Sequence, residues 1–490
     1  MIAVLGLAFA VRTLSLDAQG LWRDEVDALR FATASWSEVL ARFTQPGWNG
    51  PFYFLMLRGW IALTGRSAFA MRYLSTLWGL VGLALLYSLG RRLLGRQAAG
   101  RSVVLASFSP YLVWYAQEVK MYTWVPALVL AALYAVDRLC RRGRWTWWIV
   151  AFVSTLLAIY SHILAALLLP VAGAWFLLRR RWRPPARVGL WIAGLALLML
   201  LAILYRPLLS WQLPLAFQQR ETGYASRTLA EMAQILISGW STGITGWGQP
   251  WLTIGMAAVA LTGSVSLFVR RRVRRLIALL IWLAGPLIAV WFVSLRGPIF
   301  TDRYLIWSAP AFYLLVGAGL DQIARWLERG PVDGLRFLLL VLLAFMLIGD
   351  GVNLYRQVVR PIKPQFREAT RYLYARRAPD ALLLFQIPYN HIVVGYYAPA
   401  PLDPWAEASY TNWRSDDGSY QVQAGDVADQ MRELTAGYEE VWLIYSEATM
   451  WDERELVKAW LETHGNLVEE RHFHLVELYH FRLPRIPSSP

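Results

Sequence analysis

The sequence has little of what soluble proteins use to cover and cross-link their surfaces. Only 17% of its 490 residues are charged, whereas soluble domains carry about 25% charged residues. Its single cysteine, Cys140, excludes an intrachain disulfide framework. The chain lacks a phosphate-cradling glycine loop, an HExxH motif and a zinc-type cysteine spacing, so nothing indicates a nucleotide site. Any activated substrate is therefore expected to arrive within a membrane.

Apolar residues dominate the composition instead. Hydrophobic residues make up 57% of the chain, and 26 of its residues are tryptophans. Apolar runs recur at nearly the length that crosses a bilayer, about 20 residues, which predicts an α-helical polytopic membrane protein with about eleven transmembrane helices. The expected spans are 1–15, 73–90, 102–116, 121–137, 145–160, 162–178, 188–205, 251–269, 276–293, 303–320 and 336–350.

The positive charge is distributed as a membrane topology requires. A net charge of +15 is also typical of nucleic-acid binding, but these arginines gather between the apolar runs, so we expect no nucleic-acid partner. Loops rich in arginine are cytoplasmic; here they lie around 91–101, 138–144, 179–187, 270–275 and 325–336. The alternate loops hold fewer cations and are expected outside, at 16–72, 117–120, 160–162, 206–250 and 294–302.

Two apolar stretches in these outer loops are interpreted as interfacial helices rather than spans. Residues 50–65 are short, carry Arg58 in mid-run and would reverse the topology if they crossed. The stretch "RTLAEMAQILISGW", within 206–250, has an amphipathic pattern. The glycine-rich "STGITGWGQP" that follows is expected to be mobile.

The composition changes after about residue 351, which divides the chain into domains 1–350 and 351–490. Two short apolar runs, 379–388 and 439–447, predict buried strands. Residues 426–438 and 452–465 predict amphipathic helices, and 472–483 predicts one or two further strands. We therefore expect a C-terminal extracytoplasmic α/β domain.

Asp24 and Glu25 lie in "LWRDEVDALR", at the start of the first outer loop. One interpretation is a helix cap, with Asp24 as the N-cap residue and Asp27 three residues later. The other is catalytic: a carboxylate held at the boundary of water and lipid takes a proton from an acceptor hydroxyl. The two interpretations are compatible within one loop.

Three other outer turns carry candidate residues, each with a structural alternative. Glu118 and Lys120 lie between two spans, where an aromatic belt with snorkelling charges is the ordinary explanation. The functional alternative puts Glu118 near Asp24 and Lys120 on a phosphate. His162 is a lone interfacial histidine, most often structural. Arg303 either snorkels or neutralises a lipid phosphate.

Together these stretches resemble the polytopic GT-C glycosyltransferases, in particular the bacterial group related to protein O-mannosyltransferases and to the lipid A aminoarabinose and galacturonic acid transferases. The resemblance spans about 1–375 and departs from the family at two places: Asn49-Gly50-Pro51 replaces His-Pro-Pro, and Gln365-Phe366 replaces Asp-Trp. The stretches that carry it are "WRDEVDAL", "NGPFYFLMLRGW", "SPYLVWYAQEVKMYTW", "IYSHILA", "DRYLIWSAPAFYLL" and "PQFREATRYL".

The resemblance implies transfer of a sugar from a polyprenyl-phosphate donor on the extracytoplasmic face of a bacterial cytoplasmic membrane. It implies an inverting displacement, with the carboxylate pair at Asp24 and Glu25 and with Asp24 as the base. Lys120 and Arg303 correspond to positive groups near the lipid phosphate, and Glu118 to a group that orients the acceptor or holds Lys120. The expected substrate-binding residues are Tyr53, Tyr122 and His162.

Two rival functions and several details stay open at this point. A transporter or flippase of lipid-linked glycans would place charged residues in mid-membrane spans, whereas the acids here collect in outer loops. A non-catalytic subunit of an envelope assembly complex would keep the fold without needing Asp24. The sugar is left open, as is the envelope acceptor, which is a protein, a lipid or a polysaccharide. A divalent cation on Asp24, Glu25, Glu118 and His162 is also left open, because their spacing is not diagnostic.

Overall fold

The computed structural model describes residues 1–42, 49–142, 144–178, 210, 224–329, 333–415 and 417–484. Contacts divide the chain into two compact units. The helical unit consists of Met1–Leu16 and Phe31–Val359, and the sheet unit consists of Asp17–Arg30 and Arg360–Pro490. A short piece of the predicted first outer loop therefore belongs with the C-terminal part of the chain, which the sequence did not indicate.

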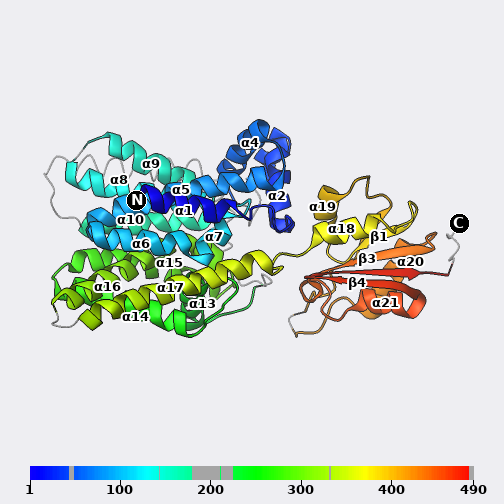
Figure 1. Cartoon of the computed structure of the whole chain (residues 1–490). Helices are drawn as coiled ribbons and strands as arrows, with labels where there is room; N and C mark the ends of the chain where they lie inside the picture. The colour runs from blue at the N-terminus through cyan, green and yellow to red at the C-terminus, as the bar shows by residue number, and fades with distance from the viewer. Residues whose placement is uncertain are drawn as a thin grey trace. The chain divides into compact units, whose positions relative to one another are not determined.

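The helical unit is built from helices that lie side by side (Figure 1). One further helix, α2 (Arg23–Thr33), crosses from the sheet unit into this one. The helices of the unit are α1 (Ile2–Thr13), α3 (Trp36–Arg42), α4 (Phe52–Thr64), α5 (Ala68–Leu93), α6 (Arg96–Phe108), α7 (Pro110–Ala116), α8 (Trp124–Arg142), α9 (Thr146–Ile159), η1 (Ile163–Leu167), α10 (Leu168–Leu178), α13 (Leu229–Thr242), α14 (Trp251–Val269), α15 (Val273–Ser294), η2 (Asp302–Ser308), α16 (Ala309–Arg329) and α17 (Asp333–Val359).

Five helices in the described part of the chain are long and apolar enough to cross a membrane. They correspond to five of the predicted spans, and they are Ala68–Leu93, Trp251–Val269, Val273–Ser294, Asp302–Glu328 and Leu340–Val359. Shorter apolar helices occupy the predicted spans 1–15, 145–160 and 162–178, and α4 occupies the predicted interfacial stretch. The predicted span 188–205 lies outside the described residues.

The predicted span 102–116 is wrong as a single helix. It divides into α6 and α7 at Ser109, whose backbone leaves the helical region at φ −55° and ψ 119°. Pro110 has no backbone N–H to continue α6 and fits the first turn of α7. The Ser109 hydroxyl accepts a hydrogen bond from the Leu112 backbone N–H at 3.3 Å, which caps the new helix.

Acidic side chains join the helix ends that carry the arginine clusters. Asp137, near the end of α8, is fully buried and accepts a hydrogen bond from Arg92 of α5 at 2.5 Å. Asp321 of α16 pairs with Arg101 of α6 at 2.5 Å and also with Arg325. Ion pairs therefore join the arginine-rich stretch 91–101 to the helix ends at 138–144 and 325–336, and the side of the membrane on which they lie stays a prediction.

The sheet unit contains a five-stranded sheet in the order β2-β1-β3-β5-β4. β1 pairs in parallel with β2 and β3, whereas β5 is antiparallel to β3 and β4. The strands are β1 (Leu382–Phe385), β2 (Trp405–Glu407), β3 (Glu440–Tyr445), β4 (Asn466–Phe473) and β5 (Val476–Arg482). The helices are α18 (Phe366–Tyr374), α19 (Asn390–Tyr397), α20 (Ala424–Thr435), η3 (Ala448–Met450) and α21 (Leu456–His464).

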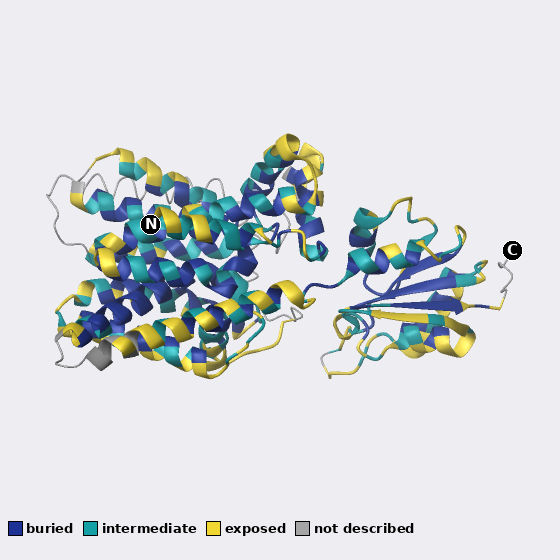
Figure 2. Cartoon of the chain, viewed as in Figure 1, coloured by how far each residue is buried: buried dark blue, intermediate teal, exposed yellow. Residues whose placement is uncertain are grey.

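Burial explains which strands the sequence revealed. All four residues of β1 are buried, and so are five of the six in β3, because helices cover both faces of parallel strands. These continuous apolar runs confirm the strands predicted in 379–388 and 439–447. α20 and α21 likewise confirm the predicted helices. β4 is a largely exposed edge strand (Figure 2), and the sequence did not distinguish it from a loop.

Candidate active site

The carboxylate pair lies inside a helix rather than at its cap. α2 begins at Arg23, and the Trp22 carbonyl accepts hydrogen bonds from the backbone N–H groups of Glu25 at 2.9 Å and Val26 at 3.1 Å. The interpretation of Asp24 as the N-cap residue is therefore wrong. Asp24 and Glu25 occupy the first turn, where the partial positive charge of the helix N-terminus stabilises carboxylates.

Glu25 forms a buried ion pair that the sequence did not reveal. Its Oε2 lies 2.9 Å from Nζ of Lys363, and the two side chains are 0% and 5% exposed. A carboxylate so enclosed and so paired is suited to positioning α2, because moving it would leave Lys363 charged and desolvated. A direct catalytic role for Glu25 stays a prediction, while Asp24 is only half-buried.

Further hydrogen bonds hold the segment before α2 within the sheet unit. Oε1 of Gln19 accepts hydrogen bonds from the backbone N–H groups of Ile362 at 3.0 Å and Lys363 at 2.9 Å. The backbone N–H of Leu21 donates to the hydroxyl of Tyr397 in α19. The residues around Asp24 are thus fixed by the chain that begins at residue 360.

In the helical unit, two of the stretches that carry the family resemblance contact each other. A Cβ added at Gly50 would lie 1.9 Å from the backbone oxygen of Tyr160, so only glycine fits there. The ring of Phe52 packs against the ring of Tyr160, with centroids 5.5 Å apart. "NGPFYFLMLRGW" and "IYSHILA" therefore meet backbone to backbone, and the departure Asn49-Gly50-Pro51 has a steric reason at its central residue.

The third stretch forms a turn fixed to α5. The Ser75 hydroxyl donates to the backbone oxygen of Glu118 at 2.6 Å, and the Thr76 hydroxyl donates to that of Ala116 at 3.1 Å. The Glu118 side chain is only 2% exposed. Lys120 is half-buried and forms no ion pair with any residue that the structure describes. A fixed turn therefore presents a cation that is available to an anionic ligand.

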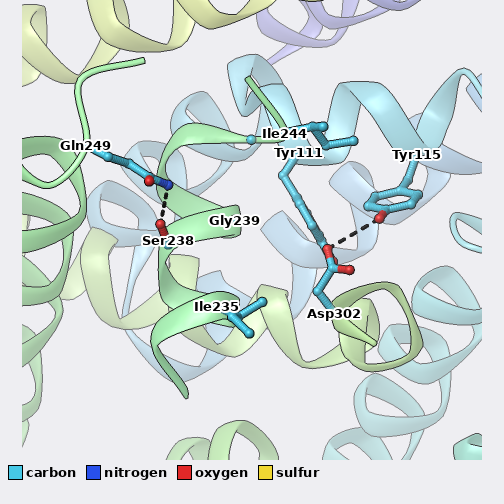
Figure 3. Close-up of a pocket in the computed structure, with 9 residues that line it drawn as sticks. Tyr111, Tyr115, Ile235, Ser238, Gly239, Ile244, Gln249 and Asp302 are labelled. Carbon is cyan, nitrogen blue, oxygen red and sulfur yellow. Dashed lines mark hydrogen bonds between the residues drawn. The ribbon is translucent and has the colours of Figure 1, made fainter. Parts of the chain in front are cut away.

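Asp302 is a site residue that sequence reasoning did not select. The Tyr115 hydroxyl donates to Oδ2 of Asp302 at 3.3 Å, and Figure 3 shows Tyr111 and Tyr115 both pointing toward this carboxylate. The three residues line a cavity of about 420 Å³, together with residues of α13 and the following turn. The size is that of a small-molecule site. The cavity lining is Tyr111, Tyr115, Ile235, Ser238, Gly239, Gly243, Ile244, Gln249 and Asp302.

The glycine-rich turn on this cavity is hydrogen-bonded to its neighbours, and its mobility stays a prediction. Asn353 of α17 is fully buried, and its Oδ1 accepts a hydrogen bond from the Trp247 backbone N–H at 2.9 Å. Nδ2 of Asn353 donates back to the Trp247 carbonyl at 3.0 Å. Nε2 of Gln249 donates to the Thr242 hydroxyl at 2.9 Å. The turn therefore forms one wall of the cavity.

His162 is a neutral group in the turn between α9 and η1. It is 4% exposed, and neither ring nitrogen has a hydrogen-bond partner among the described residues. Burial, together with the positive charge of Arg303, lowers its pKa to about 4. Its ring packs edge-on against Tyr304, with centroids 5.0 Å apart. The predicted outer turn around 160–162 thus meets the start of η2, with Arg303 near a neutral imidazole.

The two predicted substrate-binding tyrosines are enclosed. Tyr53 of α4 is 1% exposed and packs against Phe54, with ring centroids 5.7 Å apart. Tyr122 is 5% exposed, and its ring lies 5.1 Å from that of Tyr115, centroid to centroid. Tyr122 therefore supports the cavity through Tyr115. A contact of either tyrosine with substrate stays a prediction.

No group of three or more His, Cys, Asp or Glu side chains that could hold a metal ion occurs in the part of the chain that the structure describes. Glu118 and His162 belong to the helical unit, whereas Asp24 and Glu25 belong to the sheet unit. The divalent cation therefore stays a prediction.

The rarity of lysine in the sequence is a signal that could have identified Lys363, which sequence reasoning did not select. The chain has 48 basic residues but only three lysines: Lys120, Lys363 and Lys458. Lysine carries a compact, strongly hydrated point charge and is not interchangeable with arginine. Lys120 lies in a stretch that carries the resemblance, and Lys363, which pairs with Glu25, comes directly before another, "PQFREATRYL". Asp302 gave no comparable signal, because its partner Tyr115 lies 187 residues earlier in the chain.

Comparison with known proteins agrees with the sequence resemblance. Residues 46–211, about a third of the chain, match the family described as dolichyl-phosphate-mannose-protein mannosyltransferase. No curated protein matches the chain in sequence. Solved structures do match it, at sequence identities that show the fold alone.

Three of these structures illustrate the likeness. ArnT from Cupriavidus metallidurans in the apo state matches with a TM-score of 0.61 and 15% identity, covering 98% of this chain and 97% of that one. The oligosaccharyltransferase AglB from Archaeoglobus fulgidus matches with a TM-score of 0.55 and 13% identity, covering 98% and 74%. The arabinofuranosyltransferase AftD from Mycobacteria matches with a TM-score of 0.55 and 14% identity, covering 97% of this chain and 39% of that one. The chain thus has the fold of the GT-C membrane glycosyltransferases.

Proposed function

We propose that this protein is an inverting glycosyltransferase that moves a sugar from a polyprenyl-phosphate donor to an acceptor hydroxyl on the extracytoplasmic face of the membrane. The observation that carries the proposal is the fold match over nearly the whole of both chains with ArnT, which has been crystallised bound to undecaprenyl phosphate. The AglB match includes a complex with dolichol-phosphate and an inhibitory peptide. Both ligands are lipid-linked phosphates, as this proposal requires of the donor.

The phosphate of the donor is assigned to Lys120 and Arg303. Lys120 has no carboxylate partner among the described residues, so an incoming phosphate would not have to displace one. Arg303 lies near a histidine that stays neutral, since the pKa of His162 is held at about 4. Cations aimed at the leaving phosphate stabilise the charge that develops on it in the transition state.

The sugar of the donor is assigned to the cavity beside Arg303. Aromatic rings from α7 form one wall of this cavity, and Asp302 supplies a carboxylate that accepts hydrogen bonds from hydroxyl groups. The same carboxylate repels phosphate, because like charges disfavour each other at close range. The adjacent residues Asp302 and Arg303 would thus favour the sugar and the phosphate respectively.

Asp24 is assigned the role of base. In a single displacement, a carboxylate takes the proton of the acceptor hydroxyl, and the oxygen attacks the anomeric carbon from the face opposite the phosphate. The bond from carbon to phosphate oxygen then breaks, and the phosphate leaves with both electrons. Glu25 and Lys363 would position Asp24 by fixing the first turn of α2.

The test is transfer of label from radiolabelled polyprenyl-phosphate sugars to an envelope fraction, by purified full-length protein in detergent. Asp24→Asn should abolish transfer while donor binding persists. Asp17→Asn is the matched control, since its carboxylate lies in the same segment but is 65% exposed. Equal transfer by wild type and Asp24→Asn would reject the assignment of the base. An absence of transfer with every donor of the panel would count against the reaction itself.

A further inference from the structure

In the sheet unit, the carboxyl ends of the three parallel strands β2, β1 and β3 lie at one edge of the sheet. Ligands of open α/β sheets bind outside the carboxyl ends of their strands. The chain leaves this edge through three segments, which are 386–390 after β1, 408–413 after β2 and 446–452 after β3.

Four aromatic side chains from these segments form a cluster, which we call the aromatic platform: Tyr389, Tyr410, Trp413 and Trp451. The Tyr410 ring packs edge-on against Trp413 and against Trp451, with centroids 5.0 Å and 4.9 Å apart. The Tyr389 ring meets Trp451 at 5.8 Å. Tyr389 and Trp413 remain 51% and 59% exposed. Large rings held against one another yet open to solvent indicate a binding surface rather than a core.

The same edge holds two buried amides with unused acceptors. Gln386 and Asn390 are both 0% exposed. Nδ2 of Asn390 donates to the Ser446 hydroxyl at 2.7 Å, and Nε2 of Gln386 donates to Asp452 at 3.3 Å. Their carbonyl oxygens have no hydrogen-bond donor among the described residues. Buried acceptors of this kind call for water or a ligand that brings donors.

The backbone at this edge adopts a conformation that is rare without glycine. Glu447, immediately after β3, has φ 47° and ψ 37°. Residues without glycine's freedom are strained in this region, and such residues cluster at ligand sites. The Glu447 carboxylate pairs with Arg23 at 3.2 Å. The edge is therefore tied to α2 at the residue next to the proposed base.

We propose that the aromatic platform binds a neutral saccharide portion of the acceptor. The C–H face of a sugar ring packs on exposed aromatic rings such as those of Tyr389 and Trp413, and its hydroxyl groups exchange hydrogen bonds with nearby polar groups. This inference rests on the proposed function, because it names the class of acceptor for that reaction. Arg23 and Glu447 would hold the bound saccharide in register with Asp24.

The charges around the platform favour a saccharide over a lipid surface. Arg23 pairs with Glu447, and Arg414 pairs with Glu453 at 2.6 Å. A segment that docks on anionic lipid presents unpaired cations, whereas these cations are neutralised by acids in the same unit. Exposed rings beside paired charges suit a ligand that is recognised by ring faces and hydroxyl groups.

The test is binding of full-length protein in detergent to immobilised neutral oligosaccharides of glucose, mannose, galactose and arabinose. Wild type should bind at least one of them. Trp413→Ala and Tyr389→Ala should each weaken that binding about tenfold, the order expected for loss of one stacking ring. Val468→Ala is the control and should bind as wild type does, because Val468 is 49% exposed on β4 and lies away from the platform. Its neighbour Leu467 pairs with Phe481 of β5, and Phe481 pairs with Val441 near the start of β3, whereas the platform follows the end of β3.

Each outcome has a distinct meaning. Failure of wild type to bind any oligosaccharide, or unchanged binding by both variants, overturns the inference. Binding to glycolipid-free vesicles of phosphatidylglycerol and phosphatidylethanolamine that both variants lose would identify a membrane anchor instead. Asp24→Asn should keep oligosaccharide binding. If Asp24→Asn binds oligosaccharide but transfers no sugar, the two proposals are tested separately. Saccharide binding at the platform can then be confirmed even when the assignment of the base or of the reaction is wrong.

Discussion

Lys363 and Glu25 lie 338 residues apart in the chain and meet at 2.9 Å, with almost no contact with water. This pair ties the first turn of α2 to the chain that enters the sheet unit. Removing one partner of a buried pair is costly, because the other charge stays desolvated.

We expect Lys363→Met and Glu25→Gln each to lower the free energy of unfolding by about 3–5 kcal/mol. The double variant should lose less than the sum, because neither charge is then left alone. Thermal unfolding of the full-length variants in detergent measures this. Asp429→Asn is the control, because its pair with Arg432 is exposed and should be worth less than about 1 kcal/mol. Additive losses in the double variant would contradict an energetic coupling.

Asp302→Asn should weaken donor binding while leaving the chemical step nearly intact. The substitution keeps the shape of the side chain but removes the charge that strengthens its hydrogen bonds to the sugar, so KM for the donor should rise about tenfold. Steady-state kinetics with the active donor give KM and kcat separately. Asp380→Asn, on the exposed surface of the sheet unit, is the control. A fall in kcat with unchanged KM would show that Asp302 does not bind the sugar.

The stability of the protein should depend on pH through His162. Its pKa is about 4 in the folded state and 6.5 in the unfolded state, because burial and Arg303 disfavour the charged imidazole. Between these values the unfolded state binds the additional proton. The stabilising effect of the neutral His162 is therefore lost as pH falls from about 6.5 to about 4. The Tm of wild type should fall more steeply over this window than that of His162→Asn, and parallel curves would contradict the prediction.

Two glycines nine residues apart, Gly50 and Gly59, should respond differently to substitution by alanine. Gly50→Ala forces a methyl group against the Tyr160 backbone oxygen and should destabilise by about 1–3 kcal/mol or more. Gly59→Ala meets no atom within 4 Å, lies within α4 and should be neutral or stabilising by up to about 1 kcal/mol. Thermal unfolding of both variants decides this. A tolerated Gly50→Ala would mean that the two stretches separate easily.

The parts of the fold that local pattern determines were predictable. The expected span 251–269 coincides with α14, because Pro250 and the arginines from Arg270 onward bound one apolar run. The break at Ser109 was not predicted, since hydropathy averaged over a run does not register one serine followed by one proline. The start of α2 was misplaced by two residues, because Trp22, whose carbonyl accepts the first hydrogen bonds of the helix, has no side-chain signature of an N-cap.

A site residue could be predicted only where its own stretch of sequence identifies it. Lys120 was selected from its own stretch, and the structure leaves it available to a ligand. The surroundings of Asp302 depend on its contact with Tyr115, and those of Glu25 depend on its ion pair with Lys363. Each partner lies in a distant part of the chain. No periodicity in the sequence records such pairs. Membership of Asp17–Arg30 in the sheet unit depends on contacts of the same long range.

The anchoring of α2 has a consequence for how the chain is made. Glu25 leaves the ribosome 338 residues before Lys363, an interval on the order of 20–70 s at roughly 5–20 residues per second. Throughout that time the first loop lacks the side chains that later enclose it. A nascent chain released before residue 360 would keep its helices but leave Glu25 and Gln19 without their partners. Assembly of this loop is therefore a late event that waits for residues beyond 360, and until then the loop is open to proteases and chaperones.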